Sequence, residues 1–499
     1  MAVFTPQGVV KLIGVVPFNP SYENVVRFSS EYIQQSYFNS KTIDEIDEFT
    51  FIRKDSGIKV PVNIENLYGV NYVAYKNSGK WIYCFVTDKQ YINDGTTQLT
   101  LEVDVFQTWL FQMNIRRCFV EREHVADDSF GKHLTEEGLD TGDFKRVSLT
   151  RSGHLENMSI VVALTADEEL TSYYGNLYGG IYSGLYYFAV SADSGGVGAV
   201  NDLIQTLVGN GKGDRIISIF MCPTDFTTTT GASAKTYDIS PSNRPTSIDG
   251  YTPRNNKLLT YPYTFLYVSN NNGLSATYKY EFMTNPDSPQ FELTGDFSPS
   301  PTIFLIPKGY KGIGANYDEK LVLGNYPQCS WTSDIYAAWL ASNRNTMSLG
   351  FANNALQAIG GIATGNIALT GMGVSGVIGQ IAQMKDREIQ PNQARGNTGG
   401  GGSTLAVGIH DFHFMPTTIT REYAERIDNF FDMYGYKVNT VKTPNITGRP
   451  YWNYVKTNGS IVVGDIAMED IQKIQTIFNN GVTIWHNPDN VGNYSLNNH

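Results

Sequence analysis

Alternation of apolar and polar residues marks much of the first 125 residues of the chain. Within Gln98 to Trp109, every second residue from Leu99 to Val105 is apolar. Because the side chains of a strand point alternately to its two faces, this stretch predicts a half-buried antiparallel strand. Ile115 to Val125 predicts another, with one shared face for Cys118, Val120, Arg122 and His124. Further strands are expected at Gly8 to Phe18, Val70 to Tyr75 and Trp81 to Thr87, the last two forming a hairpin.

Strand patterns continue through the middle of the chain, and helical patterns appear only towards its end. Tyr261 to Val268 and Leu274 to Phe282 flank three asparagines and Gly273, which predicts a second hairpin. Helices are expected over Asp334 to Ser348, from about Ile419 with Gly435 as the C-terminal stop, and over Met468 to Phe478.

The composition favours a mainly β fold. Aromatic residues make up 13% of the chain and 48 residues are glycine, which is typical of strands and tight turns. A chain of 499 residues is expected to form several domains. We expect a β domain over 1–170, a loop-rich β region over 171–330, a helix, apolar segment and linker over 331–410, and an α+β module over 411–499.

One long segment of the chain carries no charge. The forty residues between Arg344 and Lys385 lack Asp, Glu, Lys and Arg and are rich in Gly, Ala and large aliphatic residues. A membrane-spanning helix needs about 20 mainly apolar residues, so the segment is long enough, but several Asn and Gln residues dilute it. It is therefore not expected to be a permanent anchor. A buried, Gly-rich core hairpin or a contact between subunits is the alternative. The glycine-rich stretch Arg395 to Thr404 predicts a flexible linker.

Phrases at both ends of the chain resemble a known family. They occur in the order found in the tail knob, or distal tube, proteins of small short-tailed bacteriophages of the picovirus group. The N-terminal phrases are KWIYCFVT at 80–87, EVDVFQTW at 102–109 and FVEREHV at 119–125, and the C-terminal ones are YGYKVN at 434–439, TIFNNGVTIWH at 476–486 and GNYS at 492–495. The resemblance covers about 1–125 and 415–499 and is loose over 171–330.

This resemblance implies a tube-forming ring protein with a long apolar loop insert. In that family, apolar loops close the tube before infection and then form a channel through the host membrane for DNA ejection. Leu349 to Met384 occupies the position of that loop. The expected membrane-active residues are Leu349, Phe351, Leu356, Ile359, Ile362, Ile367, Leu369, Met372, Val374, Val377, Ile378 and Ile381. Small residues four apart, which permit close helix packing in lipid, are Gly361 with Gly365 and Gly371 with Ser375 and Gly379.

The resemblance also implies the partners. We expect a homo-hexamer that contacts the upper tail or collar protein, the host cytoplasmic membrane, and genomic DNA that passes through the lumen without tight binding. A net charge of -11, with 24 acidic and 16 basic residues in 1–170, agrees with weak DNA contact, because tight duplex binding depends on cationic side chains.

The expected location follows from the same features. Four separated cysteines and an N-terminus without a secretory signal predict synthesis in a host cytoplasm. The resemblance places the protein at the virion tail tip, with insertion into the host membrane on infection. No cofactor or metal is expected.

Other functional interpretations have weaker support. Glu121 and Glu123 could form a catalytic carboxylate pair, but alternating charges usually mark a solvated face. His410 and His413 flank Asp411 without a clear third metal ligand. Gly309 to Gly314 lacks the order of a nucleotide-binding loop and predicts a turn. We therefore expect no enzymatic activity. The alternative is a receptor-binding or envelope-degrading tail tip component. The tyrosines from Tyr173 to Tyr187 are a candidate carbohydrate surface, although their pattern favours packing between strands.

Overall fold

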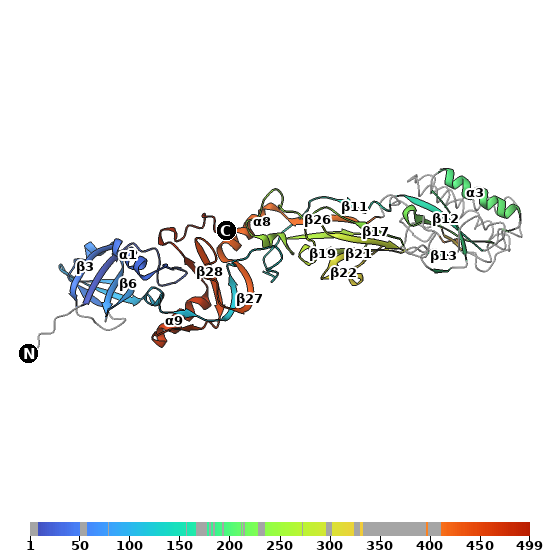
Figure 1. Cartoon of the computed structure of the whole chain (residues 1–499). Helices are drawn as coiled ribbons and strands as arrows, with labels where there is room; N and C mark the ends of the chain where they lie inside the picture. Colours follow the sequence, from blue (N-terminus) through green and yellow to red (C-terminus); the bar gives the residue numbers. More distant parts are fainter. Residues whose placement is uncertain are drawn as a thin grey trace, which may run out of the picture. The chain divides into compact units, whose positions relative to one another are not determined.

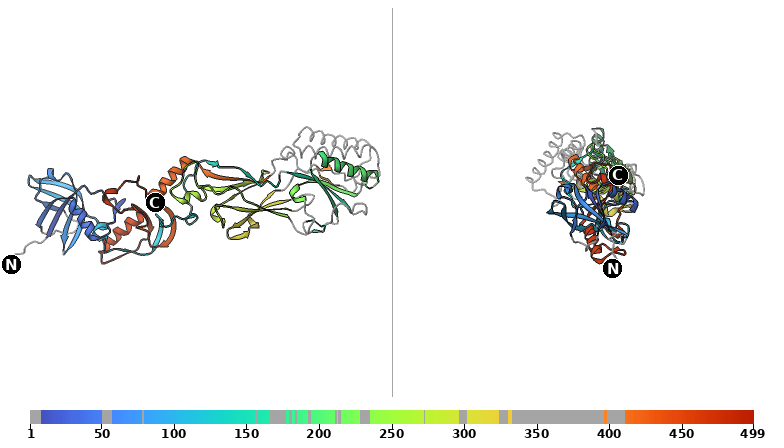
Figure 2. Two further views of the ribbon diagram at one scale, coloured as in Figure 1. Left: turned by 45° about the horizontal axis from the view of Figure 1, so that its top comes forward. Right: turned by 90° about the vertical axis from the view of Figure 1, so that its left-hand side faces the viewer.

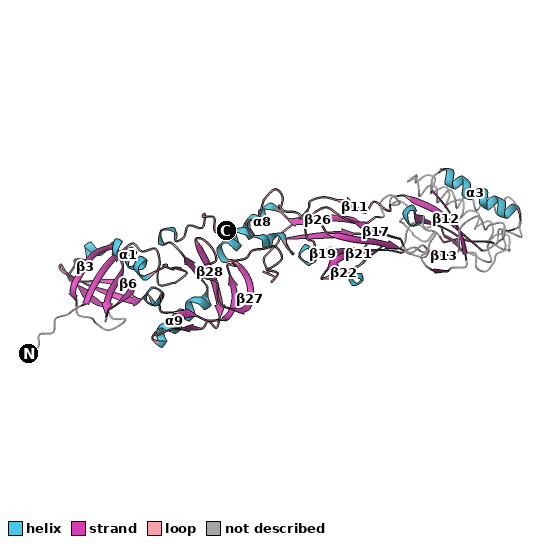
Figure 3. Ribbon diagram, viewed as in Figure 1, coloured by secondary structure: helices cyan, strands magenta, loops and turns pink. Residues whose placement is uncertain are grey.

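The chain forms two compact units, each built mainly of strands (Figures 1 and 3). Unit 1 comprises Met1–Gly142, Gly250–Leu258 and Arg421–His499, and unit 2 comprises Asp143–Asp249 and Leu259–Thr420. The chain therefore leaves unit 1 twice and returns twice. The mainly β fold predicted from composition is confirmed, whereas the division into four parts stays a prediction.

A computed structural model defines the coordinates. The structure describes residues 8–49, 57–77, 79–155, 157–165, 177–178, 181–182, 185–191, 194–210, 212, 215–227, 235–271, 273–295, 302–323, 330–332, 396–397 and 411–499.

Unit 1 begins with a six-stranded antiparallel sheet in the order β3-β1-β5-β6-β7-β4. Its strands are β1 Gly8–Gly14, β3 Thr42–Phe49, β4 Ile58–Val60, β5 Val70–Asn77, β6 Lys80–Asn93 and β7 Thr96–Val103. The predicted hairpin is confirmed as β5 and β6. Helix α1 (Glu31–Ser40) places Phe38 in a stack on Tyr72, with the ring centroids 5.2 Å apart.

The strand predicted over Gln98 to Trp109 is correct only as far as Val103. Helix α2 (Val105–Trp109) follows, because the Asp104 carboxylate accepts a hydrogen bond from the Gln107 backbone N–H and so caps a helical turn. Asp104 is fully buried, and this burial raises the pKa of its carboxyl group to about 7, against opposing hydrogen bonds from Gln107 and Tyr72.

The second sheet of unit 1 joins the N-terminal and C-terminal parts of the chain, in the order β2-β30-β28-β9-β27. Its strands are β2 Asn24–Val26, β9 Cys118–Glu123, β27 Tyr436–Lys442, β28 Trp452–Asn458 and β30 Val482–Trp485, and a short ladder pairs β8 Asn114–Ile115 with β29 Val462–Val463. Helices α8 (Arg421–Tyr434) and α9 (Met468–Asn480) confirm the two C-terminal helix predictions. Each ends before a glycine with positive φ: 64° at Gly435 and 94° at Gly481.

An irregularity in strand β9 changes which of its side chains face the core. Val120 pairs with Thr457 and Arg122 with Lys456, so Glu121 is an extra residue between two successive partners. Beyond this bulge, the Glu123 side chain lies on the same face of the sheet as Val120, and the Arg122 side chain lies on the opposite face. The prediction that Cys118, Val120, Arg122 and His124 share one face is therefore wrong for the residues after Val120. The predicted solvated position of Glu123 is wrong as well, because its side chain is fully buried.

Two sheets of unit 2 pack face to face, as shown by a Phe291–Phe414 ring contact with centroids 5.2 Å apart. The β26 sheet contains β10 Phe144–Arg146, β11 Thr150–Arg151, β18 Thr264–Ser269, β19 Ser275–Tyr278 and β26 His413–Ile419. The β21 sheet contains β17 Lys235–Ile239, β20 Gln290–Gly295, β21 Ile303–Tyr310, β22 Ile313–Ala315 and β23 Leu321–Leu323. The predicted second hairpin is confirmed as β18 and β19, and the predicted turn lies between β21 and β22.

The third sheet of unit 2, which we call the β12 sheet, has the order β15-β12-β16-β24-β25. Its strands are β12 Met158–Thr165, β15 Leu185–Ser191, β16 Ile216–Pro223, β24 Ser330–Thr332 and β25 Gly396–Asn397, and a separate short ladder pairs β13 Leu177–Tyr178 with β14 Ile181–Tyr182. Helix α3 (Ser194–Gly209) runs beside β12 (Figures 1 and 2). The linker prediction is wrong at Gly396–Asn397, which form a strand because their backbone pairs with β24.

The close approach of α8 to β9 can be tested at Gly435. A Cβ at this position would lie 2.1 Å from the backbone oxygen of Glu123, and φ is 64°. Gly138 also has a positive φ, 72°, but a Cβ there would meet nothing within 4 Å. Gly435→Ala should lower the free energy of unfolding by at least about 3 kcal/mol, and Gly138→Ala by about 1 kcal/mol, since only the first adds a backbone clash. Urea unfolding measures both, and equal losses would contradict the interpretation.

Candidate functional site

The predicted membrane-active residues, from Leu349 to Ile381, lie outside the described residues, as do the packing residues from Gly361 to Gly379 and the predicted helix over Asp334 to Ser348. The structure does describe the chain on either side of them. Strands β24 and β25 pair antiparallel, with Ser330 opposite Asn397 and Trp331 opposite Gly396. Residues 333–395 therefore begin and end on neighbouring strands of one sheet.

The other candidate carboxylates, Glu121, Glu123 and Asp411, are held in structural contacts. Glu121 forms an ion pair with Lys456 at 3.1 Å, and Glu123 accepts hydrogen bonds from Lys442 and from the backbone N–H of Asn445. Asp411 accepts from the Ser152 hydroxyl and the Phe412 backbone, while His410 lies outside the described residues. Within the described ranges, no three His, Cys, Asp or Glu side chains are grouped to hold a metal ion.

Among the described residues, no helix is both long enough and apolar enough to span a membrane. This finding does not reach the segment Leu349 to Met384, which lies outside the described residues.

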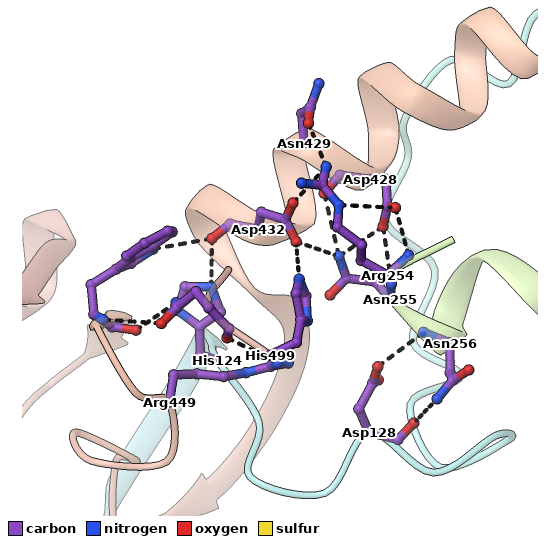
Figure 4. A network of polar contacts seen from close by, with 12 residues as sticks. His124, Asp128, Arg254, Asn255, Asn256, Asp428, Asn429, Asp432, Arg449 and His499 are labelled. Atoms are coloured by element: carbon purple, nitrogen blue, oxygen red, sulfur yellow. Dashed lines mark hydrogen bonds and ion pairs between the residues drawn. The ribbon is translucent and has the colours of Figure 1, made fainter. Parts of the chain in front are cut away.

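The most developed polar site lies inside unit 1, around two carboxylates of α8 (Figure 4). Asp428 is fully buried and accepts four hydrogen bonds from the segment Gly250–Leu258. The Tyr251 hydroxyl donates at 2.6 Å and the Arg254 backbone N–H at 2.8 Å. The Asn255 backbone N–H and side-chain amide donate at 3.1 and 2.7 Å. One carboxylate thereby fixes this short segment against α8.

Asp432 lies one turn further along α8 and connects three parts of the chain. Its carboxylate accepts from the Asn255 amide at 2.7 Å, forms an ion pair with Arg254 at 2.7 Å and lies 2.6 Å from His499 Nε2. Burial by itself would raise the pKa of Asp432, but the hydrogen bonds from His499 and Asn255 and the charge of Arg254 outweigh it, and the pKa is lowered. The side chain is therefore held as a carboxylate.

The backbone carbonyl of Asp432 ties α8 to the second sheet of unit 1. It accepts from Trp452 Nε1 at 3.1 Å and contacts His124 Nε2 at 2.9 Å. His124 Nδ1 accepts from the Tyr454 backbone N–H at 2.7 Å, so the ring proton must reside on Nε2. Burial lowers the pKa of His124 to about 3, and the nearby positive charge of Arg449 adds to this shift. The imidazole is therefore neutral, with both nitrogens occupied by backbone partners.

A second group of buried charges holds residues 126–137, the last part of the chain before it first leaves unit 1. Glu137 is fully buried and pairs with Arg122 and Lys257, and it also accepts from the Lys437 backbone at 2.9 Å. Lys257 also donates to the Thr135 carbonyl at 2.8 Å, and burial lowers the pKa of its ammonium group. Asp128 accepts from the Asn256 backbone at 2.9 Å and from the Tyr436 hydroxyl at 2.6 Å.

These contacts form a structural joint, which we define by Asp128, Glu137, Arg254, Asn255, Lys257, Asp428 and Asp432. The joint binds together residues 126–137, the segment Gly250–Leu258 and α8. All three adjoin the positions where the chain passes between the units. Because the Glu137 and Asp428 side chains are fully buried and their acceptor oxygens are paired, the joint can fix these chain segments in place.

Sequence reasoning did not find the joint. Its members are single Asp, Glu, Asn, Arg and Lys residues spread over about 300 positions, with no spacing that sets them aside from solvated charges. One signal was present in the sequence. Asp428 and Asp432 are four residues apart and so lie on one side of the predicted helix, next to the apolar Ile427 and Phe431. Two acids beside the apolar face of a helix indicate buried carboxylates.

The dependence of unit 1 on Asp428 can be measured with an amide substitution. Asp428→Asn replaces one acceptor oxygen by an NH₂ group that faces N–H donors. We expect a loss of about 3–5 kcal/mol in the free energy of unfolding, because buried donors are left unpaired. The matched control is Glu425→Gln on the same helix, where an exposed pair with Arg421 at 2.7 Å should contribute less than about 0.5 kcal/mol. A similar effect of the two substitutions in denaturant unfolding would refute the role of the joint.

The neutral state of His124 predicts acid sensitivity. The folded pKa is about 3 and the unfolded value 6.5, so the unfolded chain binds more protons between these pH values and stability falls as the pH drops through this window. From pH 7 to pH 5 the expected loss is about 2 kcal/mol. His124→Gln should be less stable at pH 7 but should lack this part of the pH dependence. Urea midpoints from pH 7 to 4.5 test this, and an unchanged slope in the variant would rule it out.

Comparison with known proteins gives consistent matches over the whole chain. Residues 227–499 match the family of the C-terminal domain of tail knob protein gp9 from Bacillus phage phi29, and residues 6–114 match the N-terminus of caudoviral major tail proteins. The chain is 26% identical to the gp9 tail knob proteins of Bacillus phages PZA and phi29, with 98% of both chains covered in each case.

A solved structure has the same fold. The tail knob protein gp12 of bacteriophage C1 matches with a TM-score of 0.65 at 17% sequence identity, over 99% of both chains. The family resemblance inferred from the phrases at the two ends of the sequence is thereby confirmed. Because the tail knob family covers more than half of the chain, the chain belongs to the family of the phi29 tail knob protein gp9 and is a structural component of the phage tail.

Proposed function

We propose that this tail component closes the distal end of the tail tube and, on infection, releases the segment Leu349 to Met384 into the host membrane as part of a channel for DNA. The observation that carries the proposal is the uncharged stretch between Arg344 and Lys385, together with the pairing of β24 and β25 at its base. A segment held at both ends can leave the folded protein only as a loop. It would then enter lipid while the β12 sheet stays folded.

The composition of the segment suits this double role. Each charged residue at the centre of a membrane-spanning helix costs about 2.5–3.5 kcal/mol on insertion scales, and the segment has none. Its Asn and Gln residues lower the mean hydropathy, which favours solubility before release. Glycines and serine at spacing four, such as Gly371, Ser375 and Gly379, allow close approach of several copies in lipid.

A ring of six copies, joined to the upper tail or collar protein, is part of this proposal. The channel needs several loops around one axis, which a closed ring supplies. Passage of DNA without tight binding is supported by the exposed acids of β3, Asp44, Glu45 and Asp47, and by the net charge of -11. Like charges repel phosphate and so favour sliding over binding.

Charge placed in the segment tests the membrane role. In the full chain, the double substitution Ile362→Asp and Ile367→Asp should abolish dye release from lipid vesicles, because two charges must then enter the hydrocarbon. The matched control with Leu at both positions should keep dye release near the unmodified level. Both variants should assemble to the same mass by light scattering. Dye release that survives the two aspartates, with normal assembly, would exclude this segment as the membrane-active part.

A further inference from the structure

Strand pairing assigns the outer faces of the two sheets that pack together in unit 2, the β26 sheet and the β21 sheet. Phe414 of β26 contacts Phe291 of β20 between the sheets, so both side chains point inward. Side chains alternate along a strand, and residues paired across strands share a face. Thr417 therefore lies on the outer face of the β26 sheet, together with its partners Arg146 of β10 and Phe265 of β18.

The outer face of the β26 sheet is aromatic and positively charged. We call it the arginine face and define it by Phe144, Arg146, Arg151, Phe265 and Tyr267. The Phe144 ring is 47% exposed, and its centroid lies 5.3 Å from that of Phe265. Arg146 and Arg151 are exposed, and neither forms an ion pair within the part of the chain that the structure describes. The described residues of this face include no Asp or Glu, so its two guanidinium groups stand beside an exposed ring without a carboxylate.

The outer face of the β21 sheet brings two carboxylates together. Asp238 of β17 and Glu292 of β20 lie directly opposite each other, on the side of the sheet that points away from Phe414. Like charges in such a position destabilise a sheet. Lys308 of β21 pairs with Asp238 at 2.8 Å, whereas Glu292 forms no ion pair with any described residue. Two carboxylates therefore share one ammonium group.

Apolar side chains continue this surface beside the carboxylates. Phe304 of β21 lies on the same side of the sheet as Glu292 and pairs with Val322 of β23, and both are half-buried. Lys320 precedes β23, with its Nζ 5.8 Å from the centroid of the Phe304 ring. We define the carboxylate face by Asp238, Glu292, Phe304 and Val322. It combines an acidic part on β17 and β20 with an apolar part on β21 and β23.

We propose that the arginine face of one copy packs against the carboxylate face of the next copy around the ring. The inference deepens the ring of the proposed function and rests on it. Each face supplies what the other lacks, because an arginine guanidinium can bridge two carboxylates through its planar set of donors. Packing of the exposed Phe144 ring against Phe304 and Val322 would remove apolar surface of both copies from water.

Charge also decides which two faces meet. A contact between two arginine faces would oppose unpaired guanidinium groups, and a contact between two carboxylate faces would oppose carboxylates, and both arrangements are repulsive. The two faces lie on opposite sides of one pair of packed sheets, so the favoured contact runs from front to back. Such a contact leaves one face of each terminal copy open, and a ring satisfies both by closing.

Charge reversal in the full chain tests the contact. Arg146→Glu and Glu292→Arg are made separately, and self-association is followed by light scattering over a range of concentrations. Each substitution brings like charges together, so the concentration for half-maximal assembly should rise at least about tenfold. Lys145→Glu is the matched control, because it makes the same charge change on β10 with a side chain that points to the other side of the sheet. It should shift that concentration by less than about threefold.

An equimolar mixture of the two variants gives a second reading. Each substituted position can then meet a substituted position of opposite charge on the neighbouring copy, and the unmodified Arg146 and Glu292 meet at the alternate contacts. The mixture should therefore regain assembly, with copies alternating around a ring of even number. Arg151→Glu and Asp238→Arg form a further pair, in case circular dichroism shows that a variant of the first pair does not fold.

The outcomes distinguish the contact from the ring. Assembly that neither reversal weakens would overturn the proposed contact and leave the ring standing. Weakening by Arg146→Glu alone, without rescue in the mixture, would also overturn it, since the arginine face would then meet a different surface. Rescue in the mixture as pairs or open filaments would support the contact and refute the ring. An unmodified chain that stays monomeric at every concentration would refute both.

Discussion

Buried carboxylates impose the constraint on which unit 1 depends. Glu123, Glu137 and Asp428 have fully buried side chains and Asp432 is nearly so, and an unpaired buried charge would cost several kcal/mol. Each must therefore collect cations or N–H donors. Those donors come from elsewhere in the chain: Lys442 for Glu123, Lys257 for Glu137, and the segment Gly250–Leu258 for Asp428. Satisfying the charges forces distant segments to meet.

This constraint explains how a unit built from three separate stretches of chain can adopt one defined arrangement. The apolar core contributes most of the driving force, with Trp452 and Trp485 fully buried and their ring centroids 5.0 Å apart. Apolar contacts tolerate shifts of position, whereas hydrogen bonds to both oxygens of Asp428 fix the placement of Gly250–Leu258 on α8. The two chain segments that belong to unit 2, each longer than 100 residues, connect to unit 1 at positions beside these contacts. Their attachment points are thus set by charge and not by packing alone.

Local features of the sequence predicted local structure well. The β5–β6 and β18–β19 hairpins follow from alternation around turn residues, and Gly435 and Gly481 mark the ends of α8 and α9. The failures arise where tertiary contacts override the local pattern. One extra residue at Glu121 turns Glu123 into the core. Its charge is tolerated because Lys442, 319 positions away in sequence, and the Asn445 backbone N–H both donate to it. The joint was missed for the same reason, since no window of the sequence contains both Asp428 and its donors.

The apolar segment faces two opposing physical demands in the proposed function. It must be covered in water, which requires a complementary apolar surface, yet it must leave that surface for lipid, which requires the cover to be weak. A surface of small and medium side chains satisfies both, because each buries little area against a partner. Lipid can replace such contacts with equally apolar ones, so release loses little hydrophobic free energy. The β24–β25 ladder would not be replaced by lipid in the same way, because its hydrogen bonds join backbone groups for which lipid offers no partner. The physics therefore favours movement of the loop while its base stays in the sheet.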